Sequence, residues 1–153
     1  MDAMETIKLG NTDMRIPKLG MGTWAIGGGP AWGDRDEQEC VTTIQKAVKS
    51  GLNLLDTAPA YNFGNSEKIV GKALEGLERK DVCLITKCGI VWTREGSLFN
   101  KVGDVQLYKN LSAESIRMEI EDSLKRLRTD YLDIYMTHWQ SVEPCFTPIA
   151  ETM

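Results

Sequence analysis

The chain has 153 residues, of which 42% are hydrophobic and 26% are charged, the composition of an ordinary globular domain. Its net charge of -4 gives no electrostatic reason to expect binding to nucleic acid or to an anionic membrane. No apolar run approaches about 18 residues, and the N-terminus lacks an apolar segment, so neither a membrane span nor a signal peptide is expected.

The cysteine and histidine content argues against a metal site. The four cysteines form no C-x-x-C pair, and the chain has a single histidine, so a zinc site is not expected. Free, partly buried thiols are typical of a reducing compartment, which predicts a cytoplasmic protein. The cysteines are Cys40, Cys83, Cys88 and Cys145.

The first third of the chain predicts a hairpin, a short strand and a loop. Two strand-like segments flank the turn-rich stretch 10–13, which predicts a β-hairpin over residues 5–19. Residues 20–24 form a short candidate strand. The glycine run and Pro30 within 25–33 predict a loop.

Helical and strand patterns then alternate. Asp36 with Glu39 predicts a capping box, and Gly51 fits the position just after that helix. Ser66 and Ser112 are the expected caps of two further helices. On the third helix, the apolar side chains recur at helical spacing and are expected on one face: Ile116, Ile120, Leu124 and Leu127.

Three apolar runs, at residues 53–57, 82–87 and 131–137, predict buried strands between these helices. The alternation favours a single α/β domain over 1–153, with a parallel sheet of four strands and three helices behind the N-terminal hairpin. This is about half of a TIM-type (β/α) barrel. Residues 88–110 are expected to form a long loop. Thr147 and Pro148 start a helix of barely one turn, so we expect the domain to be truncated.

A glycine motif near the N-terminus matches a nucleotide-binding pattern only in its spacing. Gly20-x-Gly22-x-x-Ala25 formally fits the dinucleotide fingerprint. That fingerprint must open a helix, whereas here it runs into glycines and Pro30. A Rossmann-type site is therefore not expected.

The main functional signal is a set of polar residues at the ends of the predicted strands. Asp56, Lys87 and His138 each end an apolar run, and Tyr61 follows Asp56 closely. Alone, each has an ordinary interpretation: a cap, a buried ion pair, a structural histidine or a packed ring. Because the carboxyl ends of barrel strands face the active site, the four together predict a proton-transfer site. A lysine ammonium beside a phenol stabilises the phenolate, which eases proton release near neutral pH.

Several separated motifs resemble those of the aldo-keto reductase family. The most specific is Leu55-Asp56-Thr57-Ala58-Pro59-Ala60-Tyr61, followed by Gly64-Asn65-Ser66-Glu67. Ile85-Thr86-Lys87 and Asp133-Ile134-Tyr135-Met136-Thr137-His138-Trp139 match two further signatures. The resemblance implies a (β/α)8 barrel closed at its base by the hairpin. It also implies reduction of aldehydes or ketones to alcohols with NADPH, NADH being possible.

The resemblance also implies roles for individual residues. Tyr61 would donate the proton, Lys87 would assist its release, Asp56 would support Lys87 near the nicotinamide, and His138 would orient the carbonyl. Gly22, Thr23 and Trp24 match the first-strand end that touches the cofactor. Trp92 and Trp139 would line the mouth of the substrate site together with His138.

Half a barrel would lack most cofactor contacts and would leave two unpaired edge strands, so self-association through these edges is possible. Two other functions remain open at this point. One is a non-catalytic, nicotinamide-binding or regulatory subunit. The other is an inactive truncated fragment.

Overall fold

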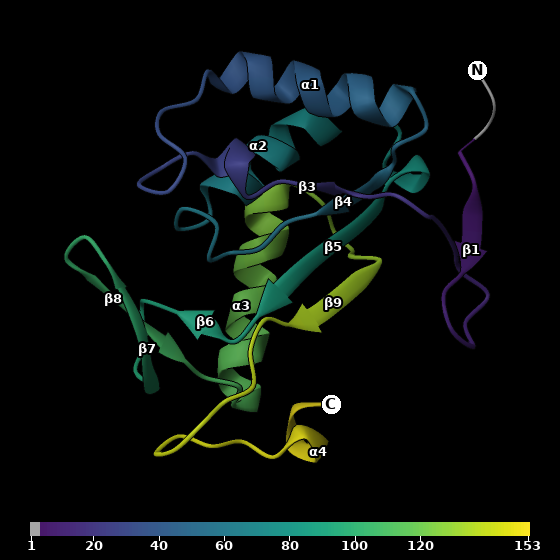
Figure 1. Ribbon diagram of the computed structural model, residues 1–153. Coiled ribbons are helices and arrows are strands. Elements are labelled where there is room, and N and C mark those ends of the chain that lie inside the picture. Colours follow the sequence, from purple (N-terminus) through teal and green to yellow (C-terminus); the bar gives the residue numbers. More distant parts are fainter. Residues whose placement is uncertain (1–3) are drawn as a thin grey trace.

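A computed structural model describes residues 4–153, in which four parallel strands form the central sheet (Figure 1). The strands lie side by side in chain order: β3 (Met21–Gly22), β4 (Leu54–Asp56), β5 (Cys83–Cys88) and β9 (Ile134–Thr137). Strands that follow chain order without reversal form the wall of a barrel, whereas a dinucleotide-binding open sheet reverses its order. The parallel α/β architecture is thus confirmed, as a partial barrel.

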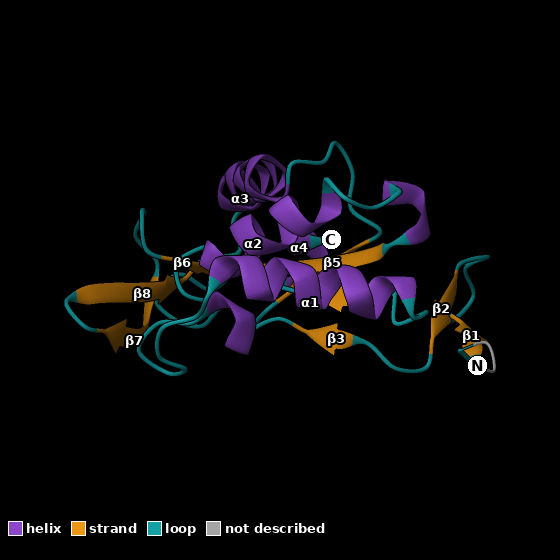
Figure 2. Cartoon of the chain, turned by 90° about the horizontal axis from the view of Figure 1, so that it is seen from above, coloured by secondary structure: helices purple, strands orange, loops and turns teal. Residues whose placement is uncertain are grey.

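Three helices connect the strands and gather on one side of the sheet (Figures 1 and 2). They are α1 (Glu37–Lys49), α2 (Asn65–Leu74) and α3 (Ala113–Leu127). The core between α1, α2 and the strands is apolar: Cys40, Val41, Ile44, Val48, Leu55, Ile69, Val70, Ala73, Leu74, Val82, Leu84 and Leu127. Leu55 and Leu84 pair across β4 and β5 and are fully buried, so alternate strand residues point away from the helices.

Most predicted helix ends are confirmed. The Asp36 side chain accepts the Glu39 amide at 2.7 Å, and Gly51 follows α1 with a φ of 97°. Ser112 accepts the Ser115 amide at 3.3 Å and caps α3. The prediction for Ser66 is wrong: Gly64 occupies the cap position of α2, and Ser66 lies inside the helix, fully buried.

The apolar face predicted for α3 is not the face that the helix buries most deeply. Ile116, Ile120 and Leu124 are only half-buried, whereas the helix buries Ser115, Glu119, Ser123 and Leu127. The buried polar groups are paired: the Ser115 hydroxyl donates to Glu119, and Arg126 donates to Ser123 and to Glu67 of α2. A polar helix face can be buried because its groups satisfy one another.

The last parallel strand begins later than predicted, at Ile134. The carboxylate of Asp133 accepts the Leu84 amide at 2.9 Å and a 2.7 Å bond from Arg79. The Asp133 side chain therefore accepts the Leu84 amide where a backbone carbonyl would do so in a regular sheet, and regular pairing starts at the next residue, Ile134.

The stretch 88–110 is not the predicted loop. It contains β6 (Ile90–Val91), β7 (Ser97–Val102) and β8 (Val105–Lys109), which pair antiparallel in the order β6-β8-β7. The two-residue turn Gly103-Asp104 joins β7 to β8, with Gly103 at a φ of 59°. This small sheet extends from the end of the parallel sheet where β5 and β9 finish (Figure 1).

The N-terminal hairpin is confirmed, with β1 (Thr6–Lys8) antiparallel to β2 (Arg15–Pro17), at the opposite end from β7 and β8 (Figure 1). Short 3-10 turns cover Ala25–Gly27 and Arg79–Asp81. α4 (Ile149–Thr152) is a single turn capped at Pro148 without a side-chain bond, so the predicted Thr147 cap is wrong. Between residues 4 and 153, no helix combines the length and apolarity needed to cross a membrane.

Gly71 tests the close packing of α2 on α3. A Cβ at this position would lie 2.4 Å from the Arg126 carbonyl oxygen and 2.9 Å from the Leu127 carbonyl carbon. Gly71→Ala should therefore lower the free energy of unfolding by about 1–3 kcal/mol, although alanine in a helix is normally favoured by about 1 kcal/mol. Urea unfolding measures this. Gly22→Ala, where a Cβ meets nothing within 4 Å, is the control and should change stability by less than about 0.5 kcal/mol.

Candidate active site

The side chain of Lys87 is the centre of the site. Its ammonium donates to both Asp56 carboxylate oxygens, at 2.7 and 2.8 Å, and to the Thr57 carbonyl at 3.0 Å. The Tyr61 hydroxyl lies 3.1 Å from the same nitrogen. Lys87 is only 9% exposed, so these oxygens replace the water that a charged ammonium requires.

The strand register places this cluster. Asp56 at the end of β4 pairs with Ile85 of β5, and Lys87 follows two residues later on the same face. That face points away from the helices, so the ion pair forms on the open side of the sheet. The predicted Asp56–Lys87 contact is present.

Tyr61 and His138 meet edge to face above the ion pair, with ring centroids 5.7 Å apart and planes at 84°. A tight turn holds Tyr61: Asn62, Phe63 and Gly64 all have positive φ, at 50°, 52° and 83°. The backbone amide of His138 donates to the Cys88 carbonyl at 2.8 Å, which ties the end of β9 to the end of β5. The four predicted residues therefore come together in one cluster.

The environment of His138 keeps its imidazole neutral. Burial, the larger cause, and the Lys87 charge together lower the pKa of His138 to about 4, and Asp56 opposes both. Near pH 7 the ring is therefore uncharged, and it can donate one hydrogen bond to a substrate oxygen.

Thr23 supports the site from behind. It is fully buried, and its hydroxyl donates to the Asp56 carbonyl at 2.9 Å and lies 2.7 Å from the Ser66 hydroxyl. Ser66 in turn donates to the Thr23 carbonyl at 2.8 Å. The hydroxyl and the carbonyl of Thr23 are therefore both hydrogen-bonded to other groups of the protein. The residue thus ties the ends of β3 and β4 together, and its predicted contact with the cofactor stays a prediction.

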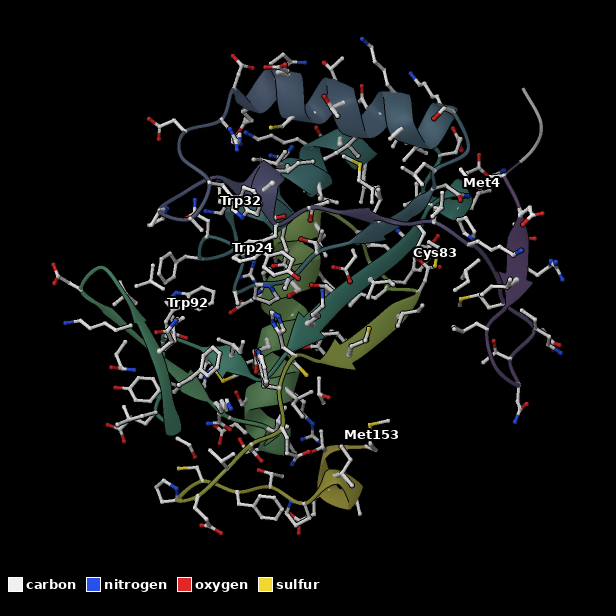
Figure 3. All side chains as sticks on the ribbon, viewed as in Figure 1. Met4, Trp24, Trp32, Cys83, Trp92 and Met153 are labelled. Atoms are coloured by element: carbon white, nitrogen blue, oxygen red, sulfur yellow. The ribbon has the colours of Figure 1, made fainter. Side chains whose placement is uncertain are left out.

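The end of β3 leaves an open shelf beside Asp56. A Cβ at Gly22 would meet nothing within 4 Å, and the Asp56 side chain beside it is 35% exposed. Trp24 stacks on Tyr61 with centroids 6.1 Å apart, and Trp32 contacts Trp24 edge to face at 5.5 Å. Figure 3 shows Trp24 and Trp32 together at this end of the sheet, with Cys83 at the other end.

A cavity of about 430 Å³ opens beside Tyr61 and His138. Trp139 lines it, as predicted. Trp92 is not among its lining residues, and its ring packs edge to face against Phe63, with centroids 5.4 Å apart. The lining residues are Trp24, Gly28, Ala31, Ala60, Tyr61, Asn62, Phe63, Ile90, Phe99, Asn100, Val102, Leu107, His138 and Trp139. A larger hollow of about 880 Å³ lies between α2 and α3 and contains none of the four clustered residues.

The sequence interpretation missed the wall of this cavity that comes from the small sheet. Phe99, Asn100 and Val102 of β7 and Leu107 of β8 line it. The signal was present, because Gly103-Asp104 is a two-residue turn typical of hairpins.

Comparison with known proteins supports the same interpretation. The model of the aldo/keto reductase family matches residues 18–153. An NADH-specific methylglyoxal reductase of Escherichia coli is 67% identical over 151 residues, which are 98% of this chain and 46% of that protein. The chain thus spans about half the length of this curated relative.

Two solved structures are similar. The glycerol dehydrogenase AKR11B4 of Gluconobacter oxydans has a TM-score of 0.78 and 37% identity, over 96% of this chain and 42% of its own. An aldo-keto reductase of Klebsiella pneumoniae in complex with NADPH has a TM-score of 0.72 and 29% identity, over 99% of this chain and 43% of its own.

The single histidine makes the electrostatics of the site measurable. In an NMR titration, the His138 imidazole should show a midpoint near pH 4. Lys87→Met should raise this midpoint, because it removes a cation, but not as far as the ordinary 6.5, because burial remains. The unfolded chain binds a proton at His138 at a higher pH than the folded chain does. The free energy of unfolding should therefore decrease as pH falls from about 6.5 to 4.

Lys72→Met is the matched control. Lys72 pairs with Glu37 on the surface, at 2.5 Å, so its loss should leave the His138 midpoint unchanged. A wild-type midpoint near 6.5 would contradict the burial of the ring.

Proposed function

The chain belongs to the aldo/keto reductase family, and we propose that it carries the acid half of a nicotinamide-dependent reductase acting on aldehydes or ketones. The observation that carries the proposal is the Lys87 ammonium, bonded at once to the Asp56 carboxylate and to the Tyr61 hydroxyl at the edge of an aromatic cavity. In this proposal, Tyr61 is the proton donor for the carbonyl oxygen, Lys87 is the cation beside it, and Asp56 is the counter-ion of Lys87.

Each residue of the cluster has a distinct task in this reaction. Bound nicotinamide would supply the hydride to the carbonyl carbon. Tyr61 gives its hydroxyl proton to the carbonyl oxygen, which yields an alcohol, and the phenolate regains a proton from water. At 3.1 Å and an effective dielectric of about 20, the Lys87 charge stabilises that phenolate by at most about 5 kcal/mol, less the opposing effects of Asp56 and burial. Neutral His138 donates a hydrogen bond to the same oxygen and orients it.

For the cofactor, we favour NADH over NADPH, which reverses the preference suggested by the family resemblance. The support is the 67% identical Escherichia coli protein, whose name specifies NADH. The structure with NADPH is less similar, at 29% identity. In this chain, Gly22, Trp24 and Asp56 are the residues that would contact the nicotinamide ring.

For the substrate, the proposal is a small carbonyl compound of the 2-oxoaldehyde type. The same relative is named for methylglyoxal, and the cavity of about 430 Å³ has room for a small molecule between aromatic walls. Cytoplasmic location is part of the proposal, because all four cysteines are free thiols. Self-association through the edges of β3 and β9 is a further possibility that the proposal includes.

The test is NADH oxidation by the purified full chain with methylglyoxal and a panel of larger aldehydes. We expect turnover, with Tyr61→Phe about 10²–10⁴-fold slower because the proton donor is lost. Tyr131→Phe is the matched control and should keep full activity, because Tyr131 is a surface residue, 41% exposed, whose ring packs under Arg79.

Cofactor titration by fluorescence separates the remaining outcomes. Nicotinamide binding without turnover, in a folded sample, would support a regulatory subunit and reject catalysis by this chain. A folded sample that shows no nicotinamide binding and no turnover would reject both functions for the chain by itself.

A further inference from the structure

One peptide unit joins the catalytic cluster to a buried carboxylate on the helix side of the sheet. The Cys88–Gly89 peptide directly follows Lys87 at the end of β5. Its carbonyl accepts the His138 amide at 2.8 Å, and its N–H donates to the Glu119 carboxylate at 2.9 Å. A single rigid plane therefore contacts His138 on one side and Glu119 on the other.

The local backbone fixes this plane. Gly89 has a φ of 94°, and a Cβ there would lie 2.5 Å from Leu111. Strand pairing with β9 ends at Cys88, so Glu119 takes the amide that the ladder leaves free.

Glu119 itself is buried without a cationic partner. It is 5% exposed, its second oxygen accepts the Ser115 hydroxyl at 3.0 Å, and no ion pair reaches it among residues 4–153. Burying an unpaired carboxylate is costly. The side-chain amide of a glutamine at position 119 could accept the same hydrogen bond from Gly89. Packing alone therefore does not require a charge at this position.

We propose that Glu119 is a positioning residue, which holds His138 and Lys87 in register through the Cys88–Gly89 peptide. A charged acceptor polarises the peptide, and a polarised peptide presents a better carbonyl acceptor to the His138 amide. The effect on catalysis rests on the proposed function, whereas the structural coupling does not.

The charge on Glu119 should change near neutral pH. Burial raises the pKa of Glu119 to about 7, against the bonds from Gly89 and Ser115 and the charges of Arg94 and Arg126. From β5 and β9, the neighbouring Cys88 and Tyr135 stay protonated there, since burial raises the pKa of Cys88 to about 12 and that of Tyr135 well above its ordinary value.

Other charged groups surround Glu119. Asp122 and Arg126 of α3 and Arg94 of the turn after β6 line a small cavity of about 50 Å³ with it, and Glu67 of α2 pairs with Arg126. Of these groups, Glu119 is the one whose carboxylate bonds directly to the Cys88–Gly89 peptide, so its ionisation can alter that peptide.

The first experiment is an NMR pH titration of the backbone amides in the full chain. The Gly89 amide proton should move downfield as pH rises, with a midpoint near 7, and the His138 amide should follow with the same midpoint. Glu119→Gln should abolish both transitions. Glu121→Gln, the same change on the exposed face of α3, should leave both in place.

The wild-type titration alone decides the coupling if Glu119→Gln fails to fold. Absence of a shared transition near pH 7, or its persistence in folded Glu119→Gln, would overturn the proposal.

Turnover provides the second readout. Wild-type kcat should contain a pH-dependent step near 7 that is missing in Glu119→Gln, with kcat reduced about three- to tenfold at pH 8 and KM unchanged. An unchanged kcat profile would limit Glu119 to a structural role and overturn the proposal. If the wild type has no turnover at all, the proposed function fails, and the amide titration still tests Glu119.

Discussion

The need to neutralise one buried ammonium constrains the whole catalytic end of the sheet. Lys87 has three N–H donors and lies among four oxygens within 3.1 Å, contributed by Asp56, Thr57 and Tyr61. A shift of β5 by one residue against β4 would turn Lys87 towards the helices, into an apolar core that cannot hold a charge. The register of the strands and the position of the proton donor are therefore set by the same requirement.

The clustered polar groups and part of the cavity wall come from different parts of the fold. The reactive groups lie at or just beyond the ends of parallel strands, where the sheet ladder and the layer of Thr23 and Ser66 hold them rigidly. Part of the cavity wall, by contrast, comes from β7 and β8, which belong to a small antiparallel sheet that extends beyond the barrel wall. Changes in this sheet can alter the shape of the cavity without disturbing the ion pair, because the hydrogen bonds of Lys87 go to β4 and the segment that follows it.

The sequence predicted some of these features and missed others. The strand ends were predictable, because a charged residue seldom closes a buried apolar strand unless a partner or a site holds it there. The buried face of α3 was not, because periodicity counts apolar residues, whereas Ser115 and Glu119 are buried by bonding to one another. Ser66 was misassigned for a related reason: a serine near a helix start resembles a cap, but here its hydroxyl is used by Thr23. The hairpin at 97–109 was missed although its turn, Gly103-Asp104, was readable.

The contacts that bring Asp56, Tyr61, Lys87 and His138 together lie within this chain, which spans about half the length of its curated relative. The Lys87 bonds reach 31 residues back to Asp56 and 26 to Tyr61, and His138 is tied to Cys88 on the neighbouring strand. The contacts proposed for the cofactor in this chain come from the shelf at Gly22, Trp24 and Asp56. The ionisation of His138 and Glu119 is therefore a property of the folded chain itself. Turnover depends in addition on how tightly that shelf alone can hold a nicotinamide.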